Sequence, residues 1–366
     1  MKKTLASLLS LLMISTSLFA QTGADKQTDD AKIISPGTNA GWVYSNGRLF
    51  RNTQGNSGLE SPKNSNQYAI YAAGFWMGAM IDGEVHTSIN EYYSTFIDGP
   101  IGESTSDSKW KLYDITSIEA KNPNSEKFKE WMAMKPYGAP TVFDNALGFE
   151  RPDVKGDQNM WSVFNDMTDH GETGSKPLGA EVNQLVWGYA RTDVLGDATF
   201  IKYVVKNKSG KTWNDTYFSL WSDPDLGDAG DDYVGSDTTL SLGYVYNVDD
   251  KKVLGKYAAG YDFLQGPVVP SPGDEANYNF SKLADHKNLP MTSFMTYENS
   301  RTSNWGDPHT AHEIYNYMQA KNKAGETAIT YPNYPAGHTT NFLLTGDPES
   351  NTGWLDSNPG DRRLMM

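Results

Sequence analysis

The sequence feature that most constrains the fold is an Asp-rich segment, Asp223–Asp237, which lies between two apolar runs. It contains six carboxylates and three glycines within fifteen residues. Strand-like runs flank it, Thr216–Trp221 before it and Thr238–Tyr246 after it, which predicts a hairpin loop. Hairpin loops usually have about 2–5 residues. A loop this long and this acidic therefore needs something to order it.

Calcium would order the loop, because Ca²⁺ takes about 6–8 oxygen ligands from carboxylates, carbonyls and water. The segment is not an EF-hand, since the sixth and twelfth positions counted from Asp223 hold Asp228 and Val234 instead of Gly and Glu. The alternative is a turn-forming acidic loop without an ion, because Asp and Gly are common turn residues. We predict a structural Ca²⁺ site whose ligands are drawn from Asp223, Asp225, Asp228, Asp231, Asp232 and Asp237.

A second acidic stretch precedes the Asp-rich segment in the chain. It could hold a second cation or complete the first site, or it could be a surface loop, and the wide spacing of its carboxylates leaves these alternatives open. Its acidic residues are Asp153, Asp157, Asp166, Asp169 and Glu172.

The strand pattern predicts a mainly β protein. Tyr68–Ile81 is a long apolar run followed by Asp82-Gly83, a strong two-residue hairpin signal. Glu181–Arg191 and Ala198–Asn207 are further strand candidates, and the second alternates with a period of two. Together with the strands around the Asp-rich segment, they predict an antiparallel β-sandwich, either immunoglobulin- or fibronectin-like or larger.

Two short helices interrupt the strands. The first is predicted at Ser125–Met134, before Pro136. The second is predicted at Pro308–Gln319, with Asp307 as its cap and a possible capping box from Thr310 and Glu313.

The N-terminus has the pattern of a secretory signal peptide. Lys2 and Lys3 form the charged region, Leu5–Phe19 forms the apolar region, and Ala20 suits a cleavage site. We therefore predict a protein that is secreted or displayed on the outer cell surface. No later apolar run reaches the roughly 18 residues that span a bilayer, so no transmembrane segment is expected after cleavage.

The remaining chain divides by composition into three parts. Residues 21–35 are predicted to be a flexible leader, residues 36–150 an N-terminal β-rich region, and residues 151–366 a β-sandwich region that carries the Asp-rich segment. The sequence contains no cysteine, which excludes disulfides, a Cys-linked lipid anchor and a Cys-ligated metal. The net charge of −14, without a basic stripe, excludes nucleic acid as an expected partner.

The sequence lacks the common catalytic motifs. It has no Gly-x-Ser-x-Gly elbow, no Walker A loop and no dinucleotide fingerprint, so we predict no catalytic residue and no cofactor other than Ca²⁺. A secreted glycan-active enzyme or glycan-binding protein remains the alternative, because aromatic residues are plentiful. A glycosidase needs only two carboxylates about 5–10 Å apart. The 45 acidic residues do not allow such a pair to be identified from sequence.

The run Tyr217–Asn247 resembles a large, functionally uncharacterised family of secreted, β-rich proteins from Bacteroidetes-type bacteria. Further matching stretches are Asp157–Asp166, Gly260–Pro270, Met291–Phe294 and Gly360–Leu364. The resemblance implies an extracellular location and a β-rich fold, and it implies no reaction.

Members of that family typically continue into immunoglobulin- or fibronectin-like modules and often finish with a type IX secretion sorting domain. This sequence stops at Met366 without either. We therefore expect a C-terminally truncated chain, which leaves the type IX route open.

These features predict a secreted or cell-surface, calcium-stabilised β-sandwich protein. Its expected role is that of a non-catalytic binding, adhesion or structural module, and its expected partner is an extracellular glycan or a cell-surface protein.

Overall fold

The computed structural model describes residues 30–248, 257–327 and 340–366 of the chain. The predicted signal peptide, residues 1–20, and the leader up to residue 29 lie outside the described residues. The end of the predicted leader belongs to a sheet, because Ala31–Ile34 forms strand β1 and pairs antiparallel with the next strand.

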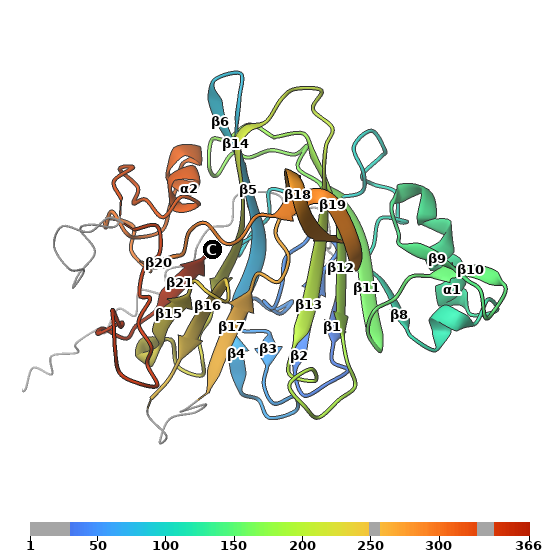
Figure 1. Ribbon diagram of the computed structural model, residues 1–366, viewed down its shortest axis with the longest axis horizontal. Helices are drawn as coiled ribbons and strands as arrows, with labels where there is room; N and C mark the ends of the chain where they lie inside the picture. The colour runs from blue at the N-terminus through green and yellow to red at the C-terminus, as the bar shows by residue number, and fades with distance from the viewer. Residues whose placement is uncertain (1–29, 249–256, 328–339) are drawn as a thin grey trace, which may run out of the picture.

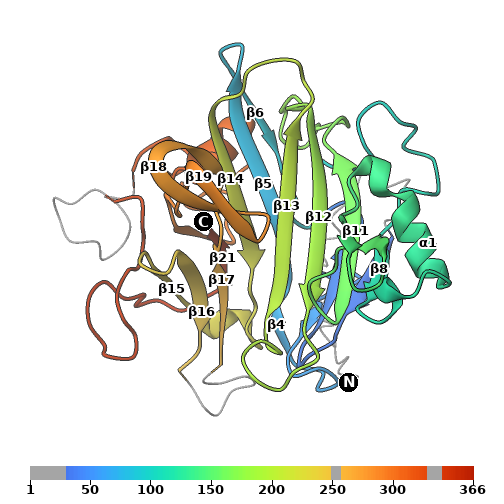
Figure 2. The same ribbon diagram turned by 45° about the vertical axis from the view of Figure 1, so that its right-hand side comes forward.

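The protein is mainly β, as predicted, with 41% of its residues in strands and two short helices. The predicted β-sandwich is wrong. The sheets are small and are arranged as a four-bladed β-propeller. Figures 1 and 2 show how the strands are divided among these sheets. Alternating hydrophobicity reports that a strand has one buried face, but not how many sheets share the buried space. The hydrophobic pattern therefore predicted a mainly β protein correctly and predicted the wrong β architecture.

Four sheets contain three or more strands, and we take these as the blades. The first sheet has the order β1 (Ala31–Ile34), β2 (Ala40–Tyr44), β3 (Leu59–Glu60), β4 (Tyr68–Ile70). The second has the order β13 (Thr199–Asn207), β12 (Ala180–Gly188), β11 (Gln158–Asn165), β7 (Ile97–Asp98), with β8 (Tyr113–Thr116) also paired to β11.

The third sheet has the order β20 (Met295–Glu298), β21 (Arg362–Met365), β14 (Asn214–Asp223), β5 (Ala72–Ile81), β6 (Glu84–Ser88). The fourth has the order β15 (Tyr233–Asp237), β16 (Leu242–Tyr246), β17 (Ala258–Asp262). Two further hairpins stand apart from these sheets: β9 (Thr141–Asp144) with β10 (Phe149–Pro152), and β18 (Val268–Tyr278) with β19 (Ser281–Asn288).

Both predicted helices are confirmed as α1 (Glu126–Ala133) and α2 (Ala311–Tyr317). Helix α2 starts later than predicted, because Thr310 and not Asp307 is its N-cap, and the Thr310 hydroxyl accepts a hydrogen bond from the Glu313 amide at 3.2 Å. Among the described residues, no helix is both long enough and apolar enough to cross a membrane. The described residues also contain three short 3₁₀ helices: η1 (Glu119–Lys121), η2 (Lys135–Tyr137) and η3 (Ala229–Asp231).

The Asp82-Gly83 turn between β5 and β6 is confirmed. Ile81 pairs with Glu84, and both turn residues have positive φ, 52° for Asp82 and 84° for Gly83. Positive φ at both central positions is the requirement of the type I′ turn that matches the twist of antiparallel strands.

Strand β5 is buried on both faces, which explains its nearly continuous apolar sequence. Phe75 and Met77 pack into one hydrophobic cluster, whereas Trp76 packs into another. In that second cluster, Trp76 stacks on Trp221 of β14 with ring centroids 6.2 Å apart. Because Trp221 precedes the Asp-rich segment by two residues, the core fixes the position at which that segment begins.

The predicted boundary after residue 150 does not divide the sheets. Strand β14 pairs with β5, and β11 pairs with β8. Each of these two sheets therefore combines strands from both predicted regions, so the described residues do not split into two β units at that point.

Candidate metal centre

The Asp-rich segment is not the loop of a hairpin. Strand β14 extends to Asp223 and pairs with β5 and β21, whereas β15 begins at Tyr233 and pairs with β16. The residues between them connect two different sheets. The first flanking run lies within β14, as predicted, but the second forms a strand only over Leu242–Tyr246, and β15 lies inside the segment predicted to be loop. Hydrophobic patterning also does not identify which strand pairs with which.

Three carboxylates meet at the start of this connection. One oxygen from each of Asp223, Asp225 and Asp361 lies within 4.8 Å of the others. Asp223 is buried at the end of β14, and Asp225 has a left-handed backbone (φ 49°), a conformation that Asp tolerates better than most residues. Asp361 immediately precedes β21.

The register between β14 and β21 explains why Asp361 joins the cluster. These antiparallel strands pair Trp221 with Met365 and Ser222 with Leu364. Continued beyond the ladder, the same register places Arg363 opposite Asp223, and then Asp361 opposite Asp225. A side chain far along the chain is thus brought to the Asp-rich segment by sheet pairing.

Arg363 supplies a positive charge to two of the three carboxylates. Its guanidinium donates to Asp361 at 2.5 Å, and its Nε lies 3.7 Å from Oδ1 of Asp223. The Tyr92 hydroxyl links the same groups, since it donates to Oδ2 of Asp223 at 2.6 Å and accepts from Arg363 Nε and Nη2 at 2.9 and 2.7 Å. Because 3.7 Å is too long for a hydrogen bond, Oδ1 of Asp223 receives none from the described residues.

Asp232 borders the cluster from another side. It is 1% exposed, and its Oδ2 accepts from the Leu226 amide at 3.0 Å. Its backbone carbonyl accepts from the Gly360 amide at 3.0 Å. Within the described residues, its Oδ1 is buried without a hydrogen-bond donor. Asp232 is therefore tied both to the residue after Asp225 and to the residue before Asp361.

The electrostatics of the site disfavour several ionised carboxylates at once. Burial raises the pKa of Asp223 to about 6, although Arg363 counteracts it. Burial, with repulsion from neighbouring carboxylates, raises the pKa of Asp225 to about 7 and that of Asp232 to about 7. A bound cation would offset both causes, because it replaces lost solvation and neutralises repulsion.

The other three predicted ligands lie outside this cluster. Asp228 is exposed and caps η3, accepting from the Gly230 amide at 3.0 Å. Asp231 is part of η3. Asp237 forms a local turn between β15 and β16, in which its side chain accepts from the amide and hydroxyl of Thr239. Of the six predicted ligands, the structure brings Asp223 and Asp225 together with Asp361 and places Asp232 beside them, while the other three lie elsewhere. That any of them binds Ca²⁺ stays a prediction.

The second acidic stretch, residues 153–172, does not form a comparable group. Asp153 pairs with Lys155 at 2.9 Å, and the Asp157 carboxylate accepts from the Ala190 amide. Asp166 is fully buried and is satisfied by three donors, including the Leu178 and Ala180 amides. Over the described ranges, the Asp223–Asp225–Asp361 group is the one set of three or more metal-ligating side chains brought within reach of an ion.

Sequence reasoning missed Asp361 and Arg363. No local pattern marks them as ligands, because they reach the site through strand pairing. The available signal was the stretch Gly360–Leu364, one of those on which the predicted resemblance to secreted β-rich proteins rests, but that resemblance assigns it no role.

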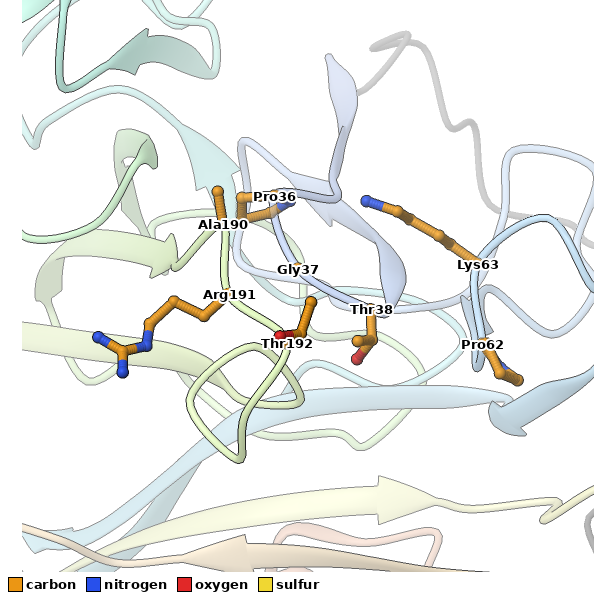
Figure 3. A pocket seen from close by; sticks show the side chains of 8 residues that line it. All are labelled: Pro36, Gly37, Thr38, Pro62, Lys63, Ala190, Arg191 and Thr192. Atoms are coloured by element: carbon orange, nitrogen blue, oxygen red, sulfur yellow. The ribbon is translucent and has the colours of Figure 1, made fainter.

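A groove of about 480 Å³ lies elsewhere, lined by the β1–β2 turn, the turn after β3 and the loop after β12. Figure 3 shows its eight lining residues, with Arg191 extending away from Lys63. Lys63 donates to the Ser35 carbonyl at 2.9 Å, and Arg191 pairs with Asp193. The lining contains no Trp, Tyr or carboxylate, so this groove gives no support to a glycan-cleaving site.

No family model, curated protein or solved structure matches this chain. The resemblance to secreted β-rich proteins therefore stays a prediction.

Proposed function

We propose that the protein is an exported, cation-stabilised module with a structural or binding role at the cell surface, and that it is not an enzyme. The observation that carries this proposal is the meeting of Asp223, Asp225 and Asp361 between two sheets. A cation at this point would tie the connection after β14 to the start of β21. The partner we propose is an extracellular glycan or a cell-surface protein.

Calcium is the ion that suits the residues best. All three side chains offer carboxylate oxygens, and oxygen ligands favour hard cations over zinc or copper. Three carboxylates and one guanidinium leave two negative charges uncompensated among these four groups, which a divalent ion would neutralise. Backbone carbonyls and water would complete a shell of about 6–8 ligands.

Thermal unfolding with and without calcium tests the proposal. Extracellular calcium sites have Kd values of about 10⁻⁴–10⁻³ M, so about 10 mM CaCl₂ gives a ten- to hundredfold excess. An ion that binds only the folded protein then stabilises it by roughly 1.4–2.7 kcal/mol. We expect a higher Tm in CaCl₂ than in EDTA, and a wild-type protein with the same Tm in both would overturn the proposal.

Matched variants locate the ion. Asp225→Asn and Asp361→Asn should each lose most of the calcium response, because each removes a charged ligand. Asp237→Asn is the control, since it makes the same chemical change in the same segment but outside the cluster. A response that survives at Asp225→Asn and Asp361→Asn would place the ion elsewhere.

Export is tested separately. The charged Lys2 and Lys3 and the apolar run after them support cleavage near Ala20. N-terminal sequencing of the extracellular fraction should find a mature chain that begins near Gln21. A cytoplasmic protein that still begins at Met1 would contradict this part of the proposal.

A further inference from the structure

Strand β21 holds an internal position in the third sheet but has few pairings with one of its neighbours. It lies between β14 and β20 (Figure 1). Four residue pairs join it to β20, whereas only two pairs in the ladder join it to β14. The amides of Leu220 and Met366 add a reciprocal contact, each donating to the other's carbonyl at 2.8 and 3.1 Å. If β21 leaves β14, β20 loses its connection to the rest of the sheet.

The charged side chains at the start of β21 face the carboxylates of β14. Asp361 belongs to the three-carboxylate cluster, and Arg363 lies between Asp361 and Asp223. Arg363 also approaches Asp307 at 3.9 Å. One guanidinium thus serves several carboxylates across the β14–β21 boundary, and among the described residues it makes no hydrogen bond to Asp225.

A second observation points to a ligand at this boundary. Asp223 is 3% exposed, and its Oδ1 is buried with no hydrogen-bond donor among the described residues. A buried carboxylate oxygen without a donor is costly, because the lost solvation is not replaced. Oδ1 of the neighbouring Asp232, which is 1% exposed, has the same property. A cation coordinated by Asp223 would replace the solvation that its Oδ1 has lost.

We propose that a divalent cation held by Asp223, Asp225 and Asp361 locks β21 into the third sheet, so that the docking of this strand depends on the ion. This inference rests on the proposed cation site. Two ligands come from β14 and the connection after it, and the third comes from the residue before β21. When β21 separates from β14, Asp361 leaves with it and the site is broken. The ion therefore binds the docked form, and its binding opposes local opening.

The size of the effect follows from this linkage. If only the docked form binds, the population of the open form falls by the factor 1 + [Ca²⁺]/Kd. Calcium at ten times its Kd should therefore slow hydrogen exchange through local opening about tenfold. Strands that do not depend on the site should show a smaller change until global unfolding dominates exchange.

Hydrogen–deuterium exchange measured by mass spectrometry tests the inference. The full chain is compared in EDTA and in 10 mM CaCl₂, and peptides covering β21 and β20 are compared with a peptide covering β12. We expect about ten- to hundredfold slower exchange in β21 and β20 with calcium, and little change in β12. Asp361→Asn should abolish the difference, and Asp225→Asn serves the same purpose if Asp361→Asn does not fold. Asp237→Asn should preserve it.

Two outcomes separate this inference from the proposed function. If calcium raises the Tm but β21 exchanges at the same rate with and without it, the ion binds without locking the strand, and the inference is overturned while the cation site stands. If calcium changes neither the Tm nor the exchange, both fall.

Discussion

The two ends of the Asp-rich segment look alike in sequence and differ in structure. At the first end, Asp223 is 3% exposed and its neighbours are Tyr92, Arg363 and Asp361, which come from distant parts of the chain. At the second end, Asp237 is partly exposed, and the described residues that donate hydrogen bonds to its side chain are Thr239 and Leu240, two and three positions later. The density of aspartates in a segment therefore does not set their chemistry. The partners that the fold brings to each aspartate do.

The largest expected loss of stability comes from removing the Arg363 guanidinium, which lies beside the carboxylates of the first end. Arg363→Met leaves Asp223 and Asp361 facing each other without Arg363, whose side chain is 7% exposed. Breaking a buried charge pair on one side costs about 3–5 kcal/mol. We expect a loss of that size in urea unfolding without calcium, and a larger calcium stabilisation than in the wild type, since the ion then replaces the guanidinium.

Arg191→Met is the matched control for this substitution. Arg191 also pairs with a carboxylate, that of Asp193, but both side chains are about half exposed. An exposed pair contributes less than about 1 kcal/mol. Equal losses for Arg363→Met and Arg191→Met would show that the first end of the segment is not electrostatically different from the surface.

Local features of the fold could be predicted from sequence because their causes lie close together in the chain. Helix α2 and the Asp82-Gly83 turn depend on capping and turn residues within a few positions, and helix α1 ends just before Pro136. The Asp237 turn is of the same kind, since its donors follow it directly. Such features can therefore be predicted from the sequence without knowledge of which strands pair.

The propeller and the complete cluster of Asp223, Asp225 and Asp361 could not be predicted in the same way. Both depend on which strands pair, and β14 pairs with β5 and β21 instead of with the strand after the Asp-rich segment. Asp361 reaches Asp225 only through the β14–β21 register. Such pairings bring residues of large sequence separation together, and hydrophobic periodicity carries no information about them.

Removing the Tyr92 hydroxyl at the first end should cost less stability than removing the Arg363 guanidinium. Tyr92→Phe removes the group that donates to Asp223 and accepts from Arg363. Hydrogen bonds to charged groups contribute about 1.5–3 kcal/mol, so we expect a loss in that range. Tyr244→Phe is the control, because its hydroxyl donates to a neutral carbonyl, that of Gly346, at 3.2 Å. The loss of stability in Tyr244→Phe should be about 0.5–1.5 kcal/mol. A larger loss for Tyr244→Phe than for Tyr92→Phe would contradict the special role of the first end.

The pH dependence of stability should also distinguish the two ends. Without calcium, the pKa of Asp225 is raised to about 7, above the value of about 3.9 in an unfolded chain. Between these values the folded protein binds more protons than the unfolded protein, so stability falls as pH rises. Each such carboxyl contributes at most about 1.4 kcal/mol per pH unit, and less where solvent reaches it.

The measurement is the Tm in EDTA between pH 5 and 8. We expect the Tm to fall over this range and expect Asp225→Asn to make the fall shallower. Calcium should oppose the fall, because it binds the ionised carboxylates. A wild-type Tm that rises from pH 5 to 8 in EDTA would contradict the raised pKa values at the first end.

The smallest effect is expected at the second end. Asp237→Ala removes a side chain that accepts from the Thr239 amide at 2.8 Å, from its hydroxyl at 2.6 Å and from the Leu240 amide at 3.2 Å. These bonds stabilise a partly exposed turn, and water can replace them when the carboxylate is lost, so the cost should be about 0.5–1 kcal/mol. The hydrogen bond from Thr239 lowers the pKa of Asp237, so its contribution is present above about pH 4 and is lost as the pH falls further, opposite in sign to that of Asp225. Urea unfolding at pH 7 and at about pH 3 checks both points. At pH 7, the calcium response of Asp237→Ala should equal that of the wild type. If Asp237→Ala abolished that response, the ion would depend on both ends of the segment, and the distinction between a buried site built by strand pairing and a local turn would fail.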